Sequence, residues 1–95
     1  MIEYTLWGIY TSYGNLEQWV KETGSKIESY VDNPEHNLSI EYFDNTDSRI
    51  SLYGITNFPV FVAVENGQPF QYLTGKLEWK EYENWVRGLN WKIDN

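Results

Sequence analysis

The sequence predicts an α/β domain in which a mixed four-stranded sheet is flanked by helices, in the order β-α-β-α-β-β-α. Segments rich in aromatic and β-branched residues alternate with segments whose apolar residues recur at helical spacing. The dipeptide Asn66-Gly67 separates the last two strand-like segments and is a strong hairpin signal. Because a helix between two strands favours parallel pairing, we expect the first two strands to be parallel and the hairpin to add an antiparallel edge.

The first strand is expected at Ile2–Tyr10, where Tyr, Thr, Leu, Trp and Ile predominate, as in a strand buried on both faces. The next five residues, 11–15, have the composition of a turn. Within this turn, Ser12 or Asn15 is expected to cap the helix that follows, because both side chains accept hydrogen bonds from the first N–H groups of a helix.

The first helix is expected from Leu16 to about residue 31, because its apolar residues keep near-helical spacing. Gly24 interrupts this pattern, and a glycine inside a helix is expected to weaken it. A polar loop at 32–37 then leads to a second strand at Leu38–Phe43.

The second half of the chain contains a short helix, a hairpin and a closing helix. Residues 44–47 supply turn and cap chemistry for a helix that ends near Tyr53, and Gly54 suits the following position, which needs a positive φ. The hairpin strands are expected at Val60–Val64 and Pro69–Leu73. The apolar face of the closing helix comprises Trp79, Tyr82, Trp85, Val86 and Leu89.

Composition limits the function classes. Ninety-five residues are enough for one small core, so a single domain spanning 1–95 is expected. The net charge is −7 without a basic run, which argues against a nucleic-acid partner. No apolar run suggests a signal peptide or a membrane span, so a cytoplasmic location is the default expectation. Aromatic residues make up 18% of the chain, more than one small core should need. The excess rings are expected either as half-exposed covering of strands and helices or on the surface as contact residues.

Catalytic and metal sites are not indicated. His36 is the only histidine and lies in a polar loop, whereas a metal site needs several converging ligands. Thr11 and Ser12 precede a helix but have no neighbouring base in the sequence to activate a hydroxyl, so helix capping is the better interpretation of Ser12. Neither a metal nor another cofactor is expected.

The second half of the sequence resembles the thioredoxin family. Tyr53-Gly54-Ile55 is similar to the family's tyrosine-glycine-isoleucine, Pro59 falls at its cis-proline, and Gly75 falls at the glycine before its last helix. Asn66-Gly67 matches its hairpin, and the four spacings agree together. The resemblance covers nearly the whole chain and implies a thioredoxin-like fold.

The first half departs from the family at the positions that carry its chemistry. In the alignment Tyr10 stands for the tryptophan before the redox motif, Thr11 and Gly14 stand for its two cysteines, and Thr5 replaces the buried acid. The chain contains no cysteine at all. Because the thiolate is the nucleophile of thiol–disulfide exchange, we expect no such enzyme activity.

The resemblance also implies a binding surface. In the family, the cis bond turns the backbone of the preceding residue outward, where an extended peptide pairs with it; here that residue is Phe58, beside Asn57. An alternative interpretation is that Pro59 is retained only because the loop needs it to enter the strand. Trp7 is expected in or near the core, whereas Tyr10, Tyr13 and Phe58 are expected to form an exposed aromatic patch.

The leading hypothesis is a redox-inactive, thioredoxin-like module that binds another protein chain or takes part in an assembly. Its expected contact residues are Tyr10, Thr11, Ser12, Tyr13, Gly14, Asn57, Phe58, Pro59, Thr74 and Gly75. The abundance of Asn, Tyr and Ile suggests an AT-rich, viral genome, and with it a location in a virus particle or replication complex.

Two other hypotheses remain open. One is a glutaredoxin-like protein that binds glutathione or another small ligand, for which Lys76 and Arg49 are the nearest cations. The other is a purely structural domain whose aromatic residues bury against a neighbouring chain.

Overall fold

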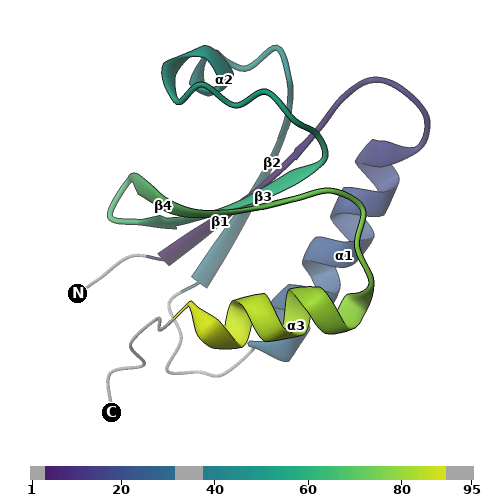
Figure 1. Ribbon diagram of the computed structural model, residues 1–95, viewed down its shortest axis with the longest axis vertical. Helices are drawn as coiled ribbons and strands as arrows, with labels where there is room; N and C mark the ends of the chain where they lie inside the picture. Colours follow the sequence, from purple (N-terminus) through teal and green to yellow (C-terminus); the bar gives the residue numbers. More distant parts are fainter. Residues whose placement is uncertain (1–3, 32–37, 90–95) are drawn as a thin grey trace.

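The computed structural model describes residues 4–31 and 38–89. The expected strand start at Ile2 and the loop at 32–37, with His36, lie outside these ranges. Figure 1 shows the elements β1 (Tyr4–Tyr10), α1 (Leu16–Tyr30), β2 (Leu38–Asp44), α2 (Ser48–Leu52), β3 (Val60–Glu65), β4 (Gln68–Thr74) and α3 (Trp79–Gly88). Their order is the one that the sequence predicts.

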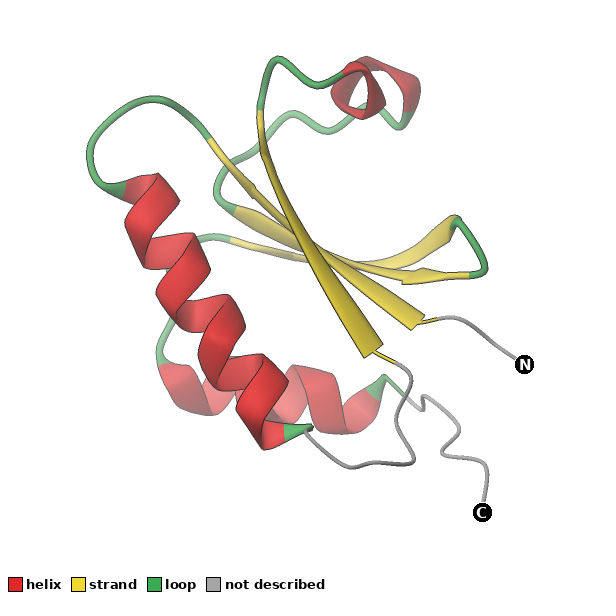
Figure 2. Cartoon of the chain, turned by 180° about the vertical axis from the view of Figure 1, so that it is seen from behind, coloured by secondary structure: helices red, strands yellow, loops and turns green. Residues whose placement is uncertain are grey.

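The four strands form one mixed sheet with the order β2-β1-β3-β4. The β1 and β2 strands are parallel, whereas β3 is antiparallel to both β1 and β4, which confirms the expected pairing (Figure 2). At the β3–β4 turn, Asn66 and Gly67 both have positive φ, as a type I′ hairpin requires. Gly54 also has a positive φ of 64° directly after the C-cap of α2, as expected.

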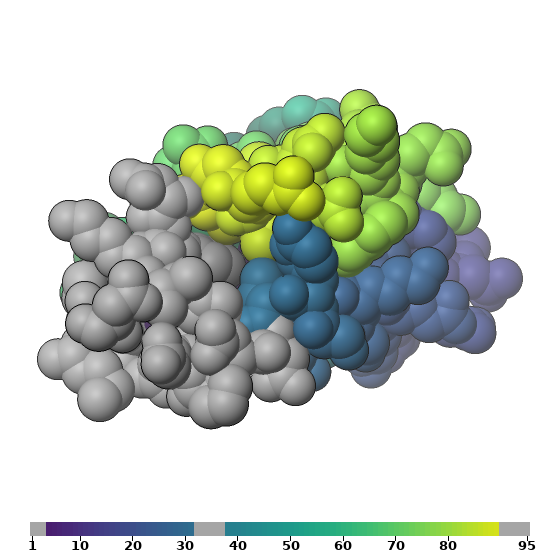
Figure 3. All heavy atoms as spheres, turned by 90° about the horizontal axis from the view of Figure 1, so that it is seen from below, coloured from purple at the N-terminus to yellow at the C-terminus, as the bar shows by residue number. Residues whose placement is uncertain are grey.

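One face of the sheet packs against α1 and α3. Strand residues Leu6 and Phe61 form a buried cluster with residues of these helices, which are Val20, Ile27, Tyr82 and Val86. The Tyr82 ring meets Phe61 edge-on at 5.5 Å between centroids. Figure 3 shows α3 lying across the end of α1, and there Tyr30 and Trp79 make a second edge-on contact.

The other face of the sheet carries a second buried cluster, and Ile50 of α2 packs against it together with residues of the segment that follows α2. Trp7 is buried in this cluster with Phe43 and Val62, in agreement with its expected core position. Arg49 of α2 stacks its guanidinium on Phe43 at 3.7 Å and forms ion pairs with Asp47 and with Glu41 of β2. The hydrogen bonds that Arg49 donates to the Asp47 carboxylate lower the pKa of Asp47 to about 2. The ion pair with Glu41 and the stacking on Phe43 therefore hold α2 against β2.

Gly24 has a packing role that the sequence pattern does not reveal. It is buried within α1, and a Cβ at this position would lie 2.8 Å from Cε1 and 2.9 Å from Cζ of Tyr42. Gly8 on β1 makes room for the same ring, because its Cβ would lie 2.9 Å from Cδ1 of Tyr42. The two glycines therefore let Tyr42 pack between β1 and α1. Burial raises the pKa of the Tyr42 hydroxyl.

Candidate functional site

Three segments of the expected binding surface meet at one end of the sheet. Antiparallel pairing sets Ile9 opposite Val60, so the turn after β1 and the loop before β3 lie at the same end. Val60 in turn pairs with Thr74, and the Gly75 N–H donates to the Pro59 carbonyl at 2.8 Å. We call residues 10–14, 57–59 and 74–75 together the loop surface.

The loop before β3 carries main-chain groups that have no backbone partner within residues 4–31 and 38–89. Pro59 is buried, and the Phe58–Pro59 peptide bond is cis. Asn57 is exposed, and its side-chain amide donates to the Thr56 hydroxyl at 3.4 Å. Within residues 4–31 and 38–89, no backbone hydrogen bond involves Thr56, Asn57 or Phe58. A bound segment could therefore pair with these N–H and C=O groups without displacing a main-chain hydrogen bond within residues 4–31 and 38–89.

The expected aromatic patch is wrong for two of its three rings. Tyr13 is 80% exposed, as expected. Tyr10, however, is half-buried against the α1 side of the core, where burial and the nearby Glu17 carboxylate raise the pKa of its hydroxyl. Phe58 is half-buried against the α2-side cluster. Both rings are apolar enough to be drawn into the core that adjoins them, so the loop surface is mostly polar.

Tyr72 is an exposed aromatic residue that the sequence reasoning did not place at this surface. It is 45% exposed on β4, and together with Tyr53, Thr56, Asn57 and Thr74 it lines a hollow of about 280 Å³. Tyr72 pairs with Val62, which places the two side chains on the same side of the sheet. Its distance from the Asn66-Gly67 turn is the sequence signal that could have indicated this pairing.

Tyr82 supports the loop surface from beneath and was also missed as a site residue. Its buried hydroxyl donates to the Gly75 carbonyl at 2.7 Å and accepts the Leu77 N–H at 3.0 Å. Burial raises the pKa of this hydroxyl. The side chain therefore fixes the turn that follows Thr74, although its spacing in the sequence identified it only as part of an apolar helix face.

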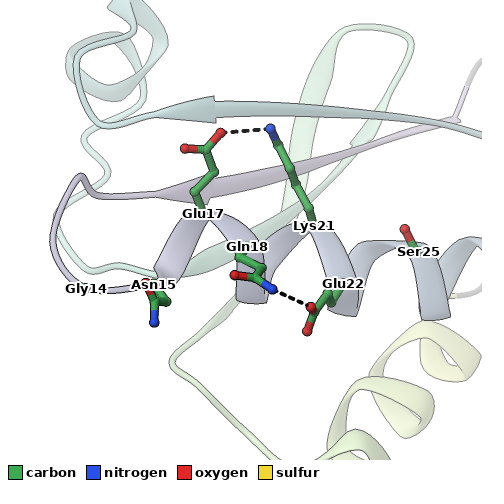
Figure 4. A pocket seen from close by; sticks show the side chains of 7 residues that line it. All are labelled: Gly14, Asn15, Glu17, Gln18, Lys21, Glu22 and Ser25. Atoms are coloured by element: carbon green, nitrogen blue, oxygen red, sulfur yellow. Dashed lines mark hydrogen bonds and ion pairs between the residues drawn. The ribbon is translucent and has the colours of Figure 1, made fainter.

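The expected capping of α1 by a side chain is not observed. The N-cap residue is Asn15, and its side chain makes no capping hydrogen bond. Ser12 is exposed and lies three positions before the N-cap, which is too early in the chain for capping. A shallow hollow of about 510 Å³ runs along α1 from Gly14. Figure 4 shows that Lys21 in this hollow pairs with Glu17 at 2.8 Å and that Glu22 accepts a hydrogen bond from Gln18 at 3.0 Å.

Of the two cations considered for a small anionic ligand, Arg49 is held away from the loop surface by ion pairs. Arg49 donates two hydrogen bonds to Glu41, at 3.0 Å each, and further bonds to Asp47. Lys76 lies over the Trp19 ring at 5.7 Å. Among the described residues, no group of three or more His, Cys, Asp or Glu side chains is arranged to hold a metal ion. In the same residues, no helix has the length and apolar character needed to cross a membrane.

Comparisons with known proteins show similarity in structure alone. No family model matches the sequence, and no curated protein matches it significantly. Mitochondrial thioredoxin 3 from Saccharomyces cerevisiae, in its oxidized form, superposes with a TM-score of 0.68 at 16% identity, covering 92% of this chain and 79% of the other.

Two further solved structures give the same result. A mutant thioredoxin from Halobacterium salinarum has a TM-score of 0.65 at 12% identity, covering 96% of this chain and 78% of its own. A designed protein has a TM-score of 0.71 at 18% identity, with 96% and 80% covered. With the sheet order and the flanking helices described above, these similarities show that the chain has a thioredoxin-like fold without cysteine.

Proposed function

We propose that this chain is a redox-inactive, thioredoxin-like module that binds another protein through the loop surface. The observation that carries the proposal is the exposed segment at Asn57, whose main-chain groups have no backbone partner among residues 4–31 and 38–89. The segment adjoins a hollow lined by Tyr72 and Thr74. Free main-chain groups beside side-chain pockets are the features by which proteins bind extended peptides.

The absence of thiols supports a binding role in place of catalysis. The positions that the resemblance assigns to the two redox cysteines are held by Thr11 and Gly14. Thiol–disulfide exchange needs a thiolate that attacks and a thiol that leaves, and neither exists in a chain without cysteine. A protein contact, by contrast, needs only the shape and the polar groups that the loop surface retains.

The small-ligand hypothesis is less well supported. Binding the carboxylates of a glutathione-like molecule requires cations that are free to donate. The guanidinium of Arg49 is instead paired with Glu41 and Asp47 and stacked on Phe43. A viral origin and a place in a virus particle or replication complex remain predictions from composition.

The proposal is tested by binding experiments with matched variants. Immobilised wild-type protein is used to capture partners from its native source, and each captured protein is purified and measured against Tyr13→Ala and Asn57→Ala. Truncating a central contact residue is expected to weaken binding by about tenfold. Lys26→Ala is the control, because Lys26 is exposed in the half of α1 that is farther from the loop surface.

Thermal melts accompany these measurements. If Tyr13→Ala and Asn57→Ala both fold normally and bind as well as the wild type, the contact lies elsewhere and the proposal is wrong.

A further inference from the structure

The outer edge of β4 is open. In the sheet order β2-β1-β3-β4, β4 is an edge strand, and no strand within residues 4–31 and 38–89 pairs with its outer side. The strand is seven residues long, and much of it is exposed. An open edge of this kind offers a row of main-chain donors and acceptors to another strand.

The register shows which β4 residues present these groups. The bond from the Gly75 N–H to the Pro59 carbonyl marks a hydrogen-bonded pair, and such pairs alternate with non-bonded ones along an antiparallel ladder. The register is regular from Val60–Thr74 to Ala63–Gln71, so Thr74 and Tyr72 belong to non-bonded pairs. In those pairs, the N–H and C=O groups of Tyr72 and Thr74 point away from β3, toward the open edge.

The side chains of the same two residues line the hollow described above. Tyr72 and Thr74 line it from β4, and Thr56 and Asn57 line it from the loop before β3. None of the side chains that line this hollow is charged, although the chain carries seven basic and fourteen acidic residues. A strand placed along β4 would therefore set alternate side chains beside an uncharged, partly aromatic hollow.

We propose that β4 accepts an extended, uncharged segment of another protein as a fifth strand, with hydrogen bonds to the main chain of Tyr72 and Thr74. This inference rests on the proposed function and specifies how the partner is bound. Only a peptide backbone repeats donors and acceptors at the two-residue spacing that this edge presents. A second copy of the chain fits less well, because each copy carries a net charge of −7 and the two would repel.

The test uses a phage-displayed library of random peptides as the probe. Peptides selected on the wild-type protein are synthesised and measured against Thr74→Pro and Thr74→Val. Proline removes the outward N–H of residue 74 and places its ring at the edge, whereas valine keeps the N–H and the branched shape. We expect the affinity to fall about tenfold or more for Thr74→Pro and to stay within about twofold for Thr74→Val.

Hydrogen exchange provides a second measurement that does not depend on the folding of the proline variant. In the wild-type protein, the amide protons of Tyr72 and Thr74 should exchange more slowly when a selected peptide is bound. Unchanged exchange at both amides, or equal affinity of the two Thr74 variants where both fold, would overturn strand addition.

The outcomes separate this inference from the proposed function. If the selected peptides lose affinity for Tyr13→Ala and Asn57→Ala but show no protection at β4, the loop surface binds them without strand addition. If protection appears at β4 while both of those variants bind normally, the edge is the site and the loop surface is not. If the protein selects no peptide above a blank surface, both strand addition at β4 and peptide binding at the loop surface are contradicted. If the protein forms a concentration-dependent dimer whose β4 amides are protected, the edge binds a second copy of the chain, which overturns the proposed occupant.

Discussion

Replacing Tyr82 with phenylalanine tests how the loop surface is held in place. The ring is 1% exposed, so the substitution keeps the packing against Phe61 and removes only the hydroxyl. That hydroxyl makes two hydrogen bonds, to the Gly75 carbonyl and from the Leu77 N–H. At about 1 kcal/mol for each bond, the free energy of unfolding should fall by about 2 kcal/mol. For a domain of this size, the melting temperature should then fall by about 8–16 °C.

The assay combines thermal melts with binding to the partner or to a selected peptide. Because the lost bonds fix the turn after Thr74, Tyr82→Phe should also weaken binding, even at temperatures where the variant is fully folded. Tyr72→Phe is the control for stability, since its hydroxyl lies on a ring that is 45% exposed. A melting temperature for Tyr82→Phe equal to that of the wild type would refute the positioning role.

Three other substitutions test separate parts of the account. Gly24→Ala should lower the free energy of unfolding by about 1 kcal/mol or more despite the better helix propensity of alanine, because its Cβ would overlap Tyr42. Gly88→Ala is the control, since nothing lies within 4 Å of a Cβ there, and equal melting temperatures for the two variants would contradict the packing role. The pKa of Asp47 is lowered from its usual 3.8 to about 2 in the folded protein, so the stability that Asp47 contributes is present above pH 3.8 and is lost as the pH falls toward 2. In acid denaturation, Asp47→Asn should therefore lose less stability than the wild type between these two pH values, and identical curves would rule out the ion pair as the cause. Phe58→Ala should lower the free energy of unfolding by about 2 kcal/mol, since the ring packs against the core, whereas Tyr13→Ala should change it by less than about 0.5 kcal/mol. A lower melting temperature for Tyr13→Ala than for Phe58→Ala would show that the two rings are placed wrongly.

The order of elements was predictable because the local signals at the turns agree with the tertiary structure. The hairpin at Asn66-Gly67 needs positive φ at both positions, and Asn-Gly is the dipeptide that adopts it most readily. Gly54 is predictable for the same reason, as a helix C-terminal residue in the left-handed region. The single-residue preferences at these positions are strong enough to locate the turns without knowledge of the core.

The composition of the candidate site was less predictable, because exposure depends on contacts between distant segments. Tyr10 and Phe58 occupy expected positions in the loop surface, but their rings pack against opposite faces of the sheet. The hydrogen bonds of Tyr82 depend on how α3 docks beneath the Gly75 turn, which no periodicity reveals. For Gly24 the sequence indicates only a local effect, the weakening of the helix. Its packing against Tyr42 depends on the tertiary structure and could not be predicted.

The most direct test of the proposed function is amide mapping of the isotope-labelled protein by two-dimensional NMR, titrated with a purified partner captured by the wild-type chain. We expect the largest shifts at residues 10–14, 57–58 and 74–75, and at Tyr72 as well if the partner adds a strand to β4. Largest shifts on the exposed faces of α1 and α3, with the loop surface unchanged, would contradict the account.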